Sequence, residues 1–173
     1  MTFNVIPVIF FQIILVLLGA ALFTLVVSAI IGVPFLPTHR KQARVMMEIA
    51  ALRPGMRAVD LGSGAGRLLF LAAERGAEAV GYELNPVLYF WTLLAIKLKG
   101  LSGRVSARCQ SLYQADLSEA DVVFAFLLPR PMKKLASKLF TELKPGAIII
   151  SYAFSIPGHT PVKKEQGIFV YKV

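Results

Sequence analysis

The sequence predicts an α/β fold in which one transmembrane helix precedes a Rossmann-like, mostly parallel sheet with an antiparallel last strand. Three observations predict it. Short apolar runs alternate with helical stretches after residue 40, as in parallel sheets that are covered by helices on both faces. A glycine-rich turn follows the first apolar run. The first 39 residues contain no Lys, Arg, Asp or Glu, so all 19 basic and 10 acidic residues come after them.

The composition limits the classes of protein. A chain of 173 residues suits one domain, and 56% hydrophobic residues exclude a disordered protein. Cys109 is the only cysteine, which excludes an internal disulfide and suits a reducing compartment. His39 and His159 have no accompanying cluster of ligands, so no metal site is expected. Anionic lipid and solvated helix faces explain the net charge of +9 better than nucleic acid, which is not an expected partner.

The N-terminal segment is almost continuously apolar from Val5 to Val33, and about 20 such residues span a bilayer as a helix. We therefore expect a transmembrane anchor over 1–33, a connector over 34–39 and the main domain over 40–173. A cleaved signal peptide would carry basic residues before a shorter apolar run. A buried helix of a soluble protein is the other alternative.

Basic residues follow this segment and none precedes it. The first of them are Arg40, Lys41 and Arg44. The positive-inside rule then predicts a single-pass membrane protein with its C-terminal domain on the cytoplasmic or mitochondrial matrix side and the lipid bilayer as a partner.

Small residues recur every four positions along the apolar segment, at Ala20, Thr24, Ser28 and Gly32. Such a ribbon permits close helix–helix contact, with a second copy of the chain or with a substrate. Small residues are also common in any membrane helix, and this interpretation is the simpler one.

The elements of the main domain can be assigned in order. A helix begins at Thr38, which suits an N-cap, and runs to about Leu52. The predicted strands are Arg57–Leu61, Ala79–Glu83, Arg104–Cys109, Asp121–Leu127, Ala147–Phe154 and Ile168–Val173. The predicted helices between them are Arg67–Arg75, Pro86–Lys99 and Met132–Leu143. The stretch before the last strand leaves room for a hairpin and not for a crossover helix, so that strand is predicted to be antiparallel.

The motif that carries chemistry is Asp60-Leu61-Gly62-Ser63-Gly64-Ala65-Gly66-Arg67, between the first strand and its helix. Glycines let the chain turn tightly beside a ligand, and the N–H groups at a helix start suit an anionic group. The dinucleotide fingerprint G-x-G-x-x-G does not fit, because Arg67 stands at its third glycine, and no P-loop ending follows.

A second acid, Glu83, ends the second strand, where a carboxylate can bind a ribose diol. S-adenosylmethionine fits this arrangement, because it has a ribose, a carboxylate and an ammonium group but no phosphate. We expect its carboxylate at the N–H groups of the glycine loop, its amino group at Asp60 or at loop carbonyls, and its ribose at Glu83. The alternative is a glycine-rich turn of some other α/β domain.

Several segments together resemble one family of class I, seven-strand methyltransferases. They are Pro34-Phe35-Leu36-Pro37-Thr38, Asp60–Arg67, Gly81-Tyr82-Glu83-Leu84-Asn85-Pro86, Leu127-Leu128-Pro129 and Phe154–Pro161. The family is that of the membrane-anchored protein-lysine methyltransferases related to the mitochondrial enzymes that act on the ATP synthase c subunit and the adenine nucleotide translocase. The resemblance implies N-methylation of a lysine in a membrane or membrane-associated protein, with S-adenosylmethionine as donor, S-adenosylhomocysteine as product and no metal. It implies a cofactor site of Asp60, Gly62, Ser63, Gly64, Gly66, Glu83, Leu84, Asn85, Ser111 and Leu112.

Three positions depart from the family pattern. Family members usually have Asp at the position of Ala65, an acid at that of Ser111 and Trp at that of His159. The loss of two acids weakens or changes the expected contacts with the cofactor, and the loss of the Trp affects the choice of substrate.

Aromatic residues near the strand ends are candidates for a lysine channel, since a desolvated channel lowers the pKa of an amine. They are Tyr82, Phe126, Tyr152 and Phe154. For any single one, an ordinary place in the core is the simpler interpretation. Thr38, Leu128 and Pro129 are further candidates for the substrate entrance, and no residue can be named as a general base from the sequence.

Two other functions remain open. A methyltransferase of this fold can act on a membrane-soluble small molecule, such as a quinone or a lipid headgroup. A non-catalytic member could keep the fold and bind the cofactor weakly, as Ala65 and Ser111 suggest.

Overall fold

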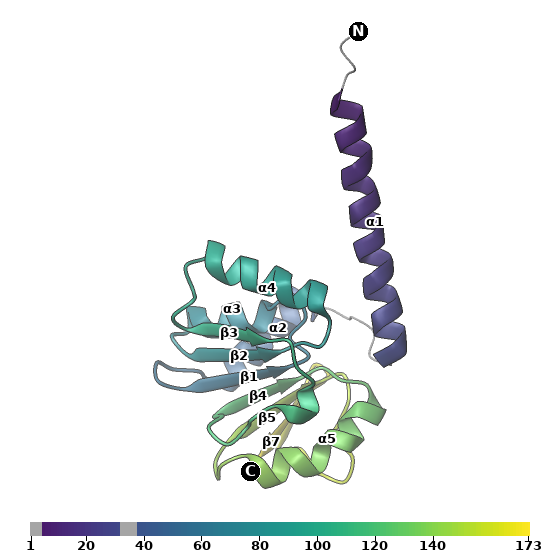
Figure 1. Ribbon diagram of the computed structural model, residues 1–173. Coiled ribbons are helices and arrows are strands. Elements are labelled where there is room, and N and C mark those ends of the chain that lie inside the picture. The colour runs from purple at the N-terminus through teal and green to yellow at the C-terminus, as the bar shows by residue number, and fades with distance from the viewer. Residues whose placement is uncertain (1–4, 32–37) are drawn as a thin grey trace. The chain divides into compact units, whose positions relative to one another are not determined.

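In the computed structural model, the chain divides into two compact units, Met1–Phe35 and Leu36–Val173. The structure describes residues 5–31 and 38–173. The first unit contains helix α1, Val5–Ile31 (Figure 1). Residues 34–37 of the predicted connector lie outside the described part of the chain, as does Gly32 of the predicted ribbon of small residues.

The predicted transmembrane anchor is wrong. No helix within residues 5–31 and 38–173 combines the length and the hydropathy that crossing a bilayer requires. The apolar run extends from Val5 to Val33, and its end lies outside the described residues. The predicted single-pass membrane location, with the C-terminal domain on the cytoplasmic or matrix side, depended on that anchor and is corrected with it.

The second unit alternates helices and strands, as the sequence pattern predicts. Its helices are α2 (Arg40–Ala50), α3 (Arg67–Glu74), α4 (Pro86–Leu98), the short 3₁₀ helix η1 (Leu112–Gln114) and α5 (Pro129–Glu142). Its strands are β1 (Arg57–Leu61), β2 (Glu78–Tyr82), β3 (Val105–Arg108), β4 (Val122–Ala125), β5 (Ile148–Tyr152), β6 (Lys163–Glu165) and β7 (Ile168–Lys172).

The strands form one seven-stranded sheet in the order β3-β2-β1-β4-β5-β7-β6. The pairs from β3 to β5 are parallel, whereas β7 is antiparallel to both of its neighbours. The prediction of a Rossmann-like, mostly parallel sheet with an antiparallel last strand is therefore confirmed. Strand β6 was not predicted as a strand, because its three residues, Lys163, Lys164 and Glu165, show no apolar pattern.

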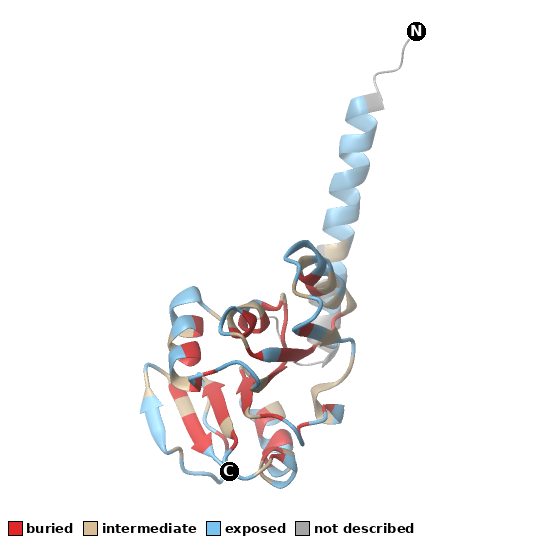
Figure 2. Ribbon diagram, turned by 90° about the vertical axis from the view of Figure 1, so that its left-hand side faces the viewer, coloured by how far each residue is buried: buried red, intermediate tan, exposed pale blue. Residues whose placement is uncertain are grey.

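The sheet separates two hydrophobic cores, because successive side chains of a strand point to opposite faces. In β1, Ala58 packs on the side of α2 and α3, while Val59 and Leu61 pack on the side of α5. The helices α2, α3 and α4 cover the first face, and α5 covers the second (Figure 1). Figure 2 shows that burial is concentrated in the strands and the inner sides of these helices.

Two helix starts differ from the predictions. His39, and not Thr38, is the N-cap of α2, and its side chain makes no capping bond. Helix α5 begins at Pro129, three residues before the predicted Met132, with Leu128 as its N-cap. Proline suits the first turn of a helix because the N–H that it lacks would have no partner there.

Candidate functional site

The carboxyl ends of β1 and β2 bring the two predicted acids close together. Asp60 in β1 pairs with Gly81 in β2, and Leu61 pairs with Tyr82. Parallel strands end at the same edge of a sheet, so the glycine loop after β1 lies beside the segment Glu83–Asn85 after β2. In open α/β sheets ligands bind at this edge.

Glu83 connects the two segments through its carboxylate. The backbone N–H of Gly64 donates to Oε2 at 2.8 Å, and that of Asn85 donates to Oε1 at 2.8 Å. Asn85 in turn caps α4, since its Oδ1 accepts hydrogen bonds from the N–H groups of Val87 and Leu88. The carboxylate predicted to bind a ribose is thus held between the loop and the start of α4.

Other N–H groups of the loop also donate within the chain. Those of Gly62 and Ser63 both donate to the carbonyl of Tyr82, at 2.9 and 3.1 Å. That of Gly66 donates to the carbonyl of Ser63 at 2.9 Å. These three N–H groups therefore already donate within the chain in this structure. The bonds shape the loop, but they do not leave these N–H groups free to bind a ligand carboxylate.

A glycine at position 81 is required by the close approach of the loop to β2. A Cβ atom at this position would lie 2.6 Å from Ser63 Oγ and 2.6 Å from Leu69 Cδ1. Real Cβ atoms do not approach other heavy atoms so closely, so a larger residue would push the loop and α3 away from β2. Gly81 thus fixes the position of Ser63.

Asp60 is 5% exposed, and its carboxyl group has an unusual proton affinity. Burial raises the pKa of Asp60 to about 7, and the neighbouring charge of Glu83 acts in the same direction. A cation beside the two carboxyl groups would favour the ionised form. The pair is therefore suited to a positively charged ligand.

Thr92 is a part of the site that the sequence reasoning missed. This residue of α4 is fully buried, and its hydroxyl donates to the carbonyl of Gly64 at 3.0 Å. The signal that could have indicated it is a single polar residue on the inner side of an otherwise apolar helix. Gly64 is consequently held at its N–H by Glu83 and at its carbonyl by Thr92.

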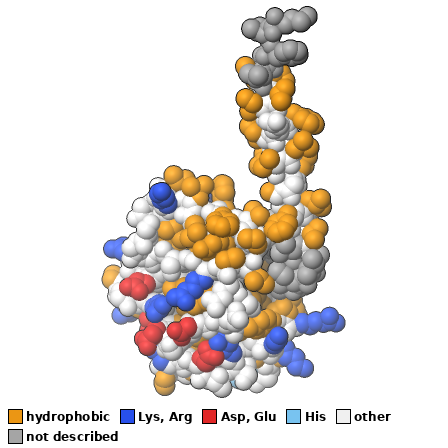
Figure 3. All heavy atoms as spheres, viewed as in Figure 1, with side chains coloured by type: hydrophobic (Ala, Val, Ile, Leu, Met, Phe, Trp, Pro, Cys, Tyr) orange, Lys and Arg blue, Asp and Glu red, His pale blue; other side chains and the backbone are white. Residues whose placement is uncertain are grey.

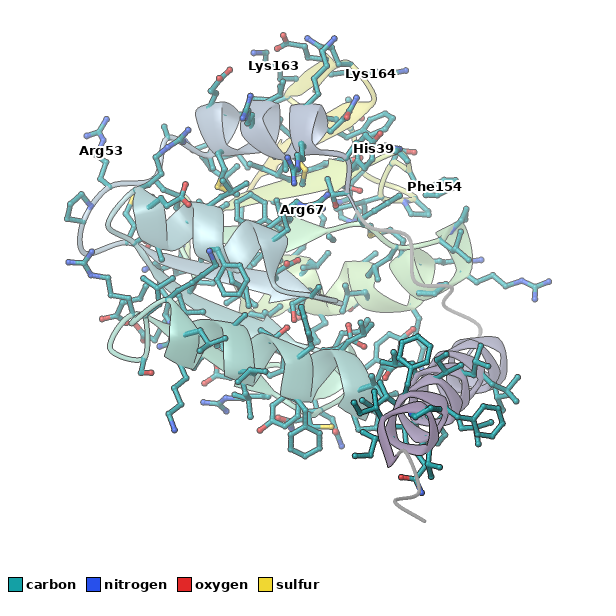
Figure 4. All side chains as sticks on the ribbon, turned by 90° about the horizontal axis from the view of Figure 1, so that it is seen from above. His39, Arg53, Arg67, Phe154, Lys163 and Lys164 are labelled. Carbon is teal, nitrogen blue, oxygen red and sulfur yellow. The ribbon has the colours of Figure 1, made fainter. Side chains whose placement is uncertain are left out.

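The start of α2 also contacts the glycine loop region. The guanidinium Nη1 of Arg67, the first residue of α3, donates to the carbonyl of Thr38. Figure 4 labels Arg67, at the start of α3, and His39, which follows Thr38 and caps α2. Thr38 therefore contacts Arg67, at the end of the loop, through its backbone carbonyl, and it does not cap α2.

The carboxyl ends of β4 and β5 provide a different surface. Phe126 follows β4, and its ring packs against that of Tyr152, the last residue of β5, at 4.8 Å between centroids. Ala153 has a φ of 65°, which turns the chain sharply before Phe154. A non-glycine residue in this conformation is strained and is often found at functional sites. Two of the four predicted channel aromatics thus form one half-buried pair.

Other predicted residues lie in different surroundings. Tyr82 is buried in the core on the α5 side, and its hydroxyl accepts a hydrogen bond from the N–H of Asp116, so it does not form a channel.

The remaining predicted residues lie near the ends of η1, β2 and α5. Ser111 caps η1, and Leu112 packs on the core of the α5 side. Leu84 is 42% exposed next to Glu83. Leu128 and Pro129 lie at the start of α5, where they follow Phe126 and Leu127.

The residues present fit the predicted cofactor. Ser63 Oγ and Asn85 Nδ2 are buried and have no hydrogen-bonding partner among the residues that the structure describes. Buried polar atoms without partners are rare in native proteins and indicate a missing ligand or water. They lie in the segments that carry Asp60 and Glu83, which could accept bonds from an ammonium group and a ribose diol. Within the described ranges, no group of three metal-ligating side chains occurs.

Comparison with known proteins gives a consistent result. Residues 60–163 match the family model "ANTKMT methyltransferase domain". A protein-lysine N-methyltransferase of Saccharolobus islandicus is 39% identical over 140 residues, which cover 78% of this chain and 87% of that protein. The human lysine N-methyltransferase of the ATP synthase c subunit is 35% identical over 74% of this chain. The match spans 54% of the human protein, about half of its length.

Solved structures include methyltransferases with the cofactor product bound. An RNA methyltransferase from Salinibacter ruber in complex with S-adenosyl-L-homocysteine is 35% identical and has a TM-score of 0.74, covering 79% of this chain and 91% of that one. A methyltransferase from Geobacter sulfurreducens in complex with the same molecule is 23% identical, with a TM-score of 0.59 over 72% of this chain and 53% of that one, and shows likeness of fold alone.

Proposed function

Since this chain belongs to the family of S-adenosylmethionine-dependent protein-lysine N-methyltransferases, we propose that it methylates a lysine side chain of a membrane protein. The observation that carries the proposal is the site at the ends of β1 and β2. There, the same two segments carry the carboxyl groups of Asp60 and Glu83 and the buried, unpartnered atoms Ser63 Oγ and Asn85 Nδ2. We further propose that these four residues, placed by the loop that the glycines shape, hold the donor.

Each of these side chains has a distinct role in holding the donor. The carboxylate of Glu83 accepts hydrogen bonds from the hydroxyl groups of the ribose, and the ionised carboxylate of Asp60 binds the ammonium group. Ser63 Oγ and Asn85 Nδ2 supply hydrogen bonds that nothing else in the described structure uses. When bound, the donor supplies a methyl group on a sulfonium, which makes the methyl carbon electrophilic and leaves a neutral thioether.

The aromatic pair of Phe126 and Tyr152 acts on the acceptor. A lysine amine has an ordinary pKa of about 10.4, and only its neutral form has a lone pair that can attack a methyl group. Apolar rings exclude water and disfavour the ammonium form, which lowers the pKa of the amine. Alignment of the neutral amine is then the main contribution of the protein to the rate.

Two observations support a membrane protein, with an apolar surface, as the substrate. The relatives include enzymes that are named for the ATP synthase c subunit and for the adenine nucleotide translocase. On this chain, α4 exposes a row of large apolar residues (Figure 3). They are Phe90, Trp91, Leu94 and Leu98, which are 50–77% exposed. A surface of this kind is suited to an apolar partner.

The names of other relatives favour two further substrate classes. The Salinibacter ruber structure, which is 35% identical to this chain, is that of an RNA methyltransferase. A ubiquinone/menaquinone biosynthesis C-methyltransferase of Shewanella frigidimarina is 30% identical over 78% of this chain, which favours a quinone.

One labelling experiment tests all three classes. The purified protein is incubated with S-adenosylmethionine that carries a tritiated methyl group, together with membranes and total RNA from the same cells. Label is then measured in protein bands, in RNA and in the organic extract. The matched control is the Glu83→Gln variant at the same concentration.

We expect label in a protein band, recovered as methyl-lysine after hydrolysis, and much less label with Glu83→Gln at the same donor concentration. Label in RNA or in the organic extract, with none in protein, would overturn the lysine proposal in favour of the corresponding relative. Label in a protein that is recovered on a residue other than lysine would also contradict it.

A further inference from the structure

Gly64 is held from two directions by side chains that lie far from it in the sequence. The carboxylate of Glu83 accepts a hydrogen bond from the N–H of Gly64 at 2.8 Å, and the hydroxyl of Thr92 donates one to the carbonyl of Gly64 at 3.0 Å. We propose that Thr92 is a positioning residue, which keeps the glycine loop in its donor-binding form while Glu83 engages the donor. The inference rests on the proposed function, because it concerns the same donor site.

Both ends of the Thr92 side chain contact the loop. Its hydroxyl reaches Gly64, whereas its methyl group, Cγ2, lies 2.9 Å from where a Cβ of Gly66 would stand. Thr92 is 0% exposed, so water cannot replace either contact. Gly66 has a φ of 78° and is the N-cap of α3, so the methyl group packs at the point where the loop becomes a helix.

The two bonds to Gly64 differ in what happens to them on binding. The carboxylate of Glu83 already accepts two backbone N–H groups, and ribose hydroxyl groups would compete for the same oxygens. The hydroxyl of Thr92 faces the loop from α4 and donates to a carbonyl, so this competition does not involve it. Thr92 can therefore hold Gly64 when the N–H bond to Glu83 weakens.

A loop without this bond would populate other conformations before the donor arrives. Apparent affinity falls in proportion to the fraction of the protein in the binding-competent form. The loss of one hydrogen bond to a buried carbonyl is sufficient for an effect of roughly tenfold.

The test compares hydroxyl-free and hydroxyl-bearing variants at position 92. Thr92→Val keeps the methyl group and the shape but removes the donor, while Thr92→Ser keeps the donor and removes the methyl group. Thr92→Ala is a second variant without a hydroxyl, in case valine disturbs folding. Thr141→Val is the matched control, because Thr141 Oγ1 also donates to a backbone carbonyl at 3.0 Å, within the exposed side of α5.

The dissociation constant for S-adenosylhomocysteine is measured by calorimetry, and Michaelis constants are measured for both substrates. We expect Thr92→Val and Thr92→Ala to weaken binding roughly tenfold and to raise the KM for the donor alone. Thr92→Ser and Thr141→Val should bind within about twofold of the wild type, since neither loses the bond to Gly64.

The outcomes separate this inference from the proposed function. A wild-type protein that does not bind S-adenosylhomocysteine would overturn the donor site itself. If the wild type binds, an unchanged affinity in Thr92→Val and Thr92→Ala would overturn the role of Thr92. Equal losses in Thr92→Ser and Thr92→Ala would also overturn it, because packing of the methyl group and not the hydrogen bond would then be responsible.

Discussion

The ends of β1 and β2 and the ends of β4 and β5 lie along one edge of the same sheet but differ in chemistry. The first pair ends in a polar network around Asp60 and Glu83. The second pair ends in apolar and aromatic side chains, with the rings of Phe126 and Tyr152 in contact. We infer that one edge serves two tasks, since charge and hydrogen bonds hold a cationic donor while apolar rings keep an amine neutral.

The sheet order brings these two regions together. Strand β1 is central and pairs with β2 on one side and with β4 on the other. The loop after β1 can therefore contact both regions, and a Cβ at Gly62 would lie 3.6 Å from Leu127 after β4. Variants in the two regions should consequently affect different steps of the same reaction.

The largest effect is expected from Glu83→Gln, which removes the charge of Glu83 and keeps the shape of its side chain. Hydrogen bonds to a charged group contribute about 1.5–3 kcal/mol, so donor affinity should fall by roughly 10- to 150-fold. Calorimetry with S-adenosylhomocysteine measures this loss of affinity. Glu165→Gln is the control, because Glu165 pairs with Lys163 in β6 at the other end of the sheet. An affinity that is unchanged in Glu83→Gln would mean that the polar region does not hold the donor.

The next effect is expected from Gly81→Ala, which tests the close approach that builds the polar region. Its Cβ would overlap with Ser63 Oγ and Leu69 Cδ1, and overpacking of this kind costs about 1–3 kcal/mol of the free energy of unfolding. Gly103→Ala is the matched control, since a Cβ there has no heavy atom within 4 Å. Urea denaturation of both variants measures the difference, and equal stabilities would contradict the close approach.

A pH titration tests the raised pKa of Asp60, which is about 7. A cationic donor requires the ionised carboxylate, so affinity should increase with pH up to about 7, at most tenfold per pH unit, and level off above it. Between the ordinary pKa of 3.8 and about 7, the native state holds a proton that the unfolded chain does not. The free energy of unfolding of the donor-free protein should therefore fall as pH rises across this range. In Asp60→Asn both dependences should be flatter, and an identical pH profile would contradict this assignment.

The smallest effect is expected from Phe126→Leu in the aromatic region. The ring contact with Tyr152 contributes about 0.5–1.5 kcal/mol, so the KM for the protein substrate should rise by roughly 2- to 10-fold. The dissociation constant for S-adenosylhomocysteine should stay the same, which serves as the internal control. If instead donor binding weakens and the KM for the substrate does not change, the two regions are not divided as we propose.

Much of the fold could be predicted because local signals are strong there. The apolar runs that became β1, β2, β4 and β5 have the length and composition of buried parallel strands. Strand β6 could not be predicted, because it forms only by pairing with β7 and has a charged sequence. The transmembrane anchor was predicted from apolar composition alone, and the described residues contain no helix that meets the requirement.

In the candidate site, too, residues with a local sequence signal could be predicted and those placed by tertiary packing could not. The glycine loop, Asp60 and Glu83 were indicated by their positions after two successive strands. Thr92 was not, because its partner Gly64 lies 28 residues away and only the packing of α4 brings them together. The sequence makes Tyr82 a candidate for a channel, but strand alternation places it in the core on the α5 side.

The sequence by itself determined the family, the order of the strands and helices other than β6 and η1, and the two acids at the ends of the first two strands, since each depends on neighbouring residues or on short motifs. Only the tertiary structure decided which groups meet. It placed Gly64 between Glu83 and Thr92, brought Phe126 against Tyr152, and buried Asp60 deeply enough to raise its pKa to about 7. The physical reason is that hydrogen bonding, ring packing and desolvation depend on distances between atoms that are remote in the chain.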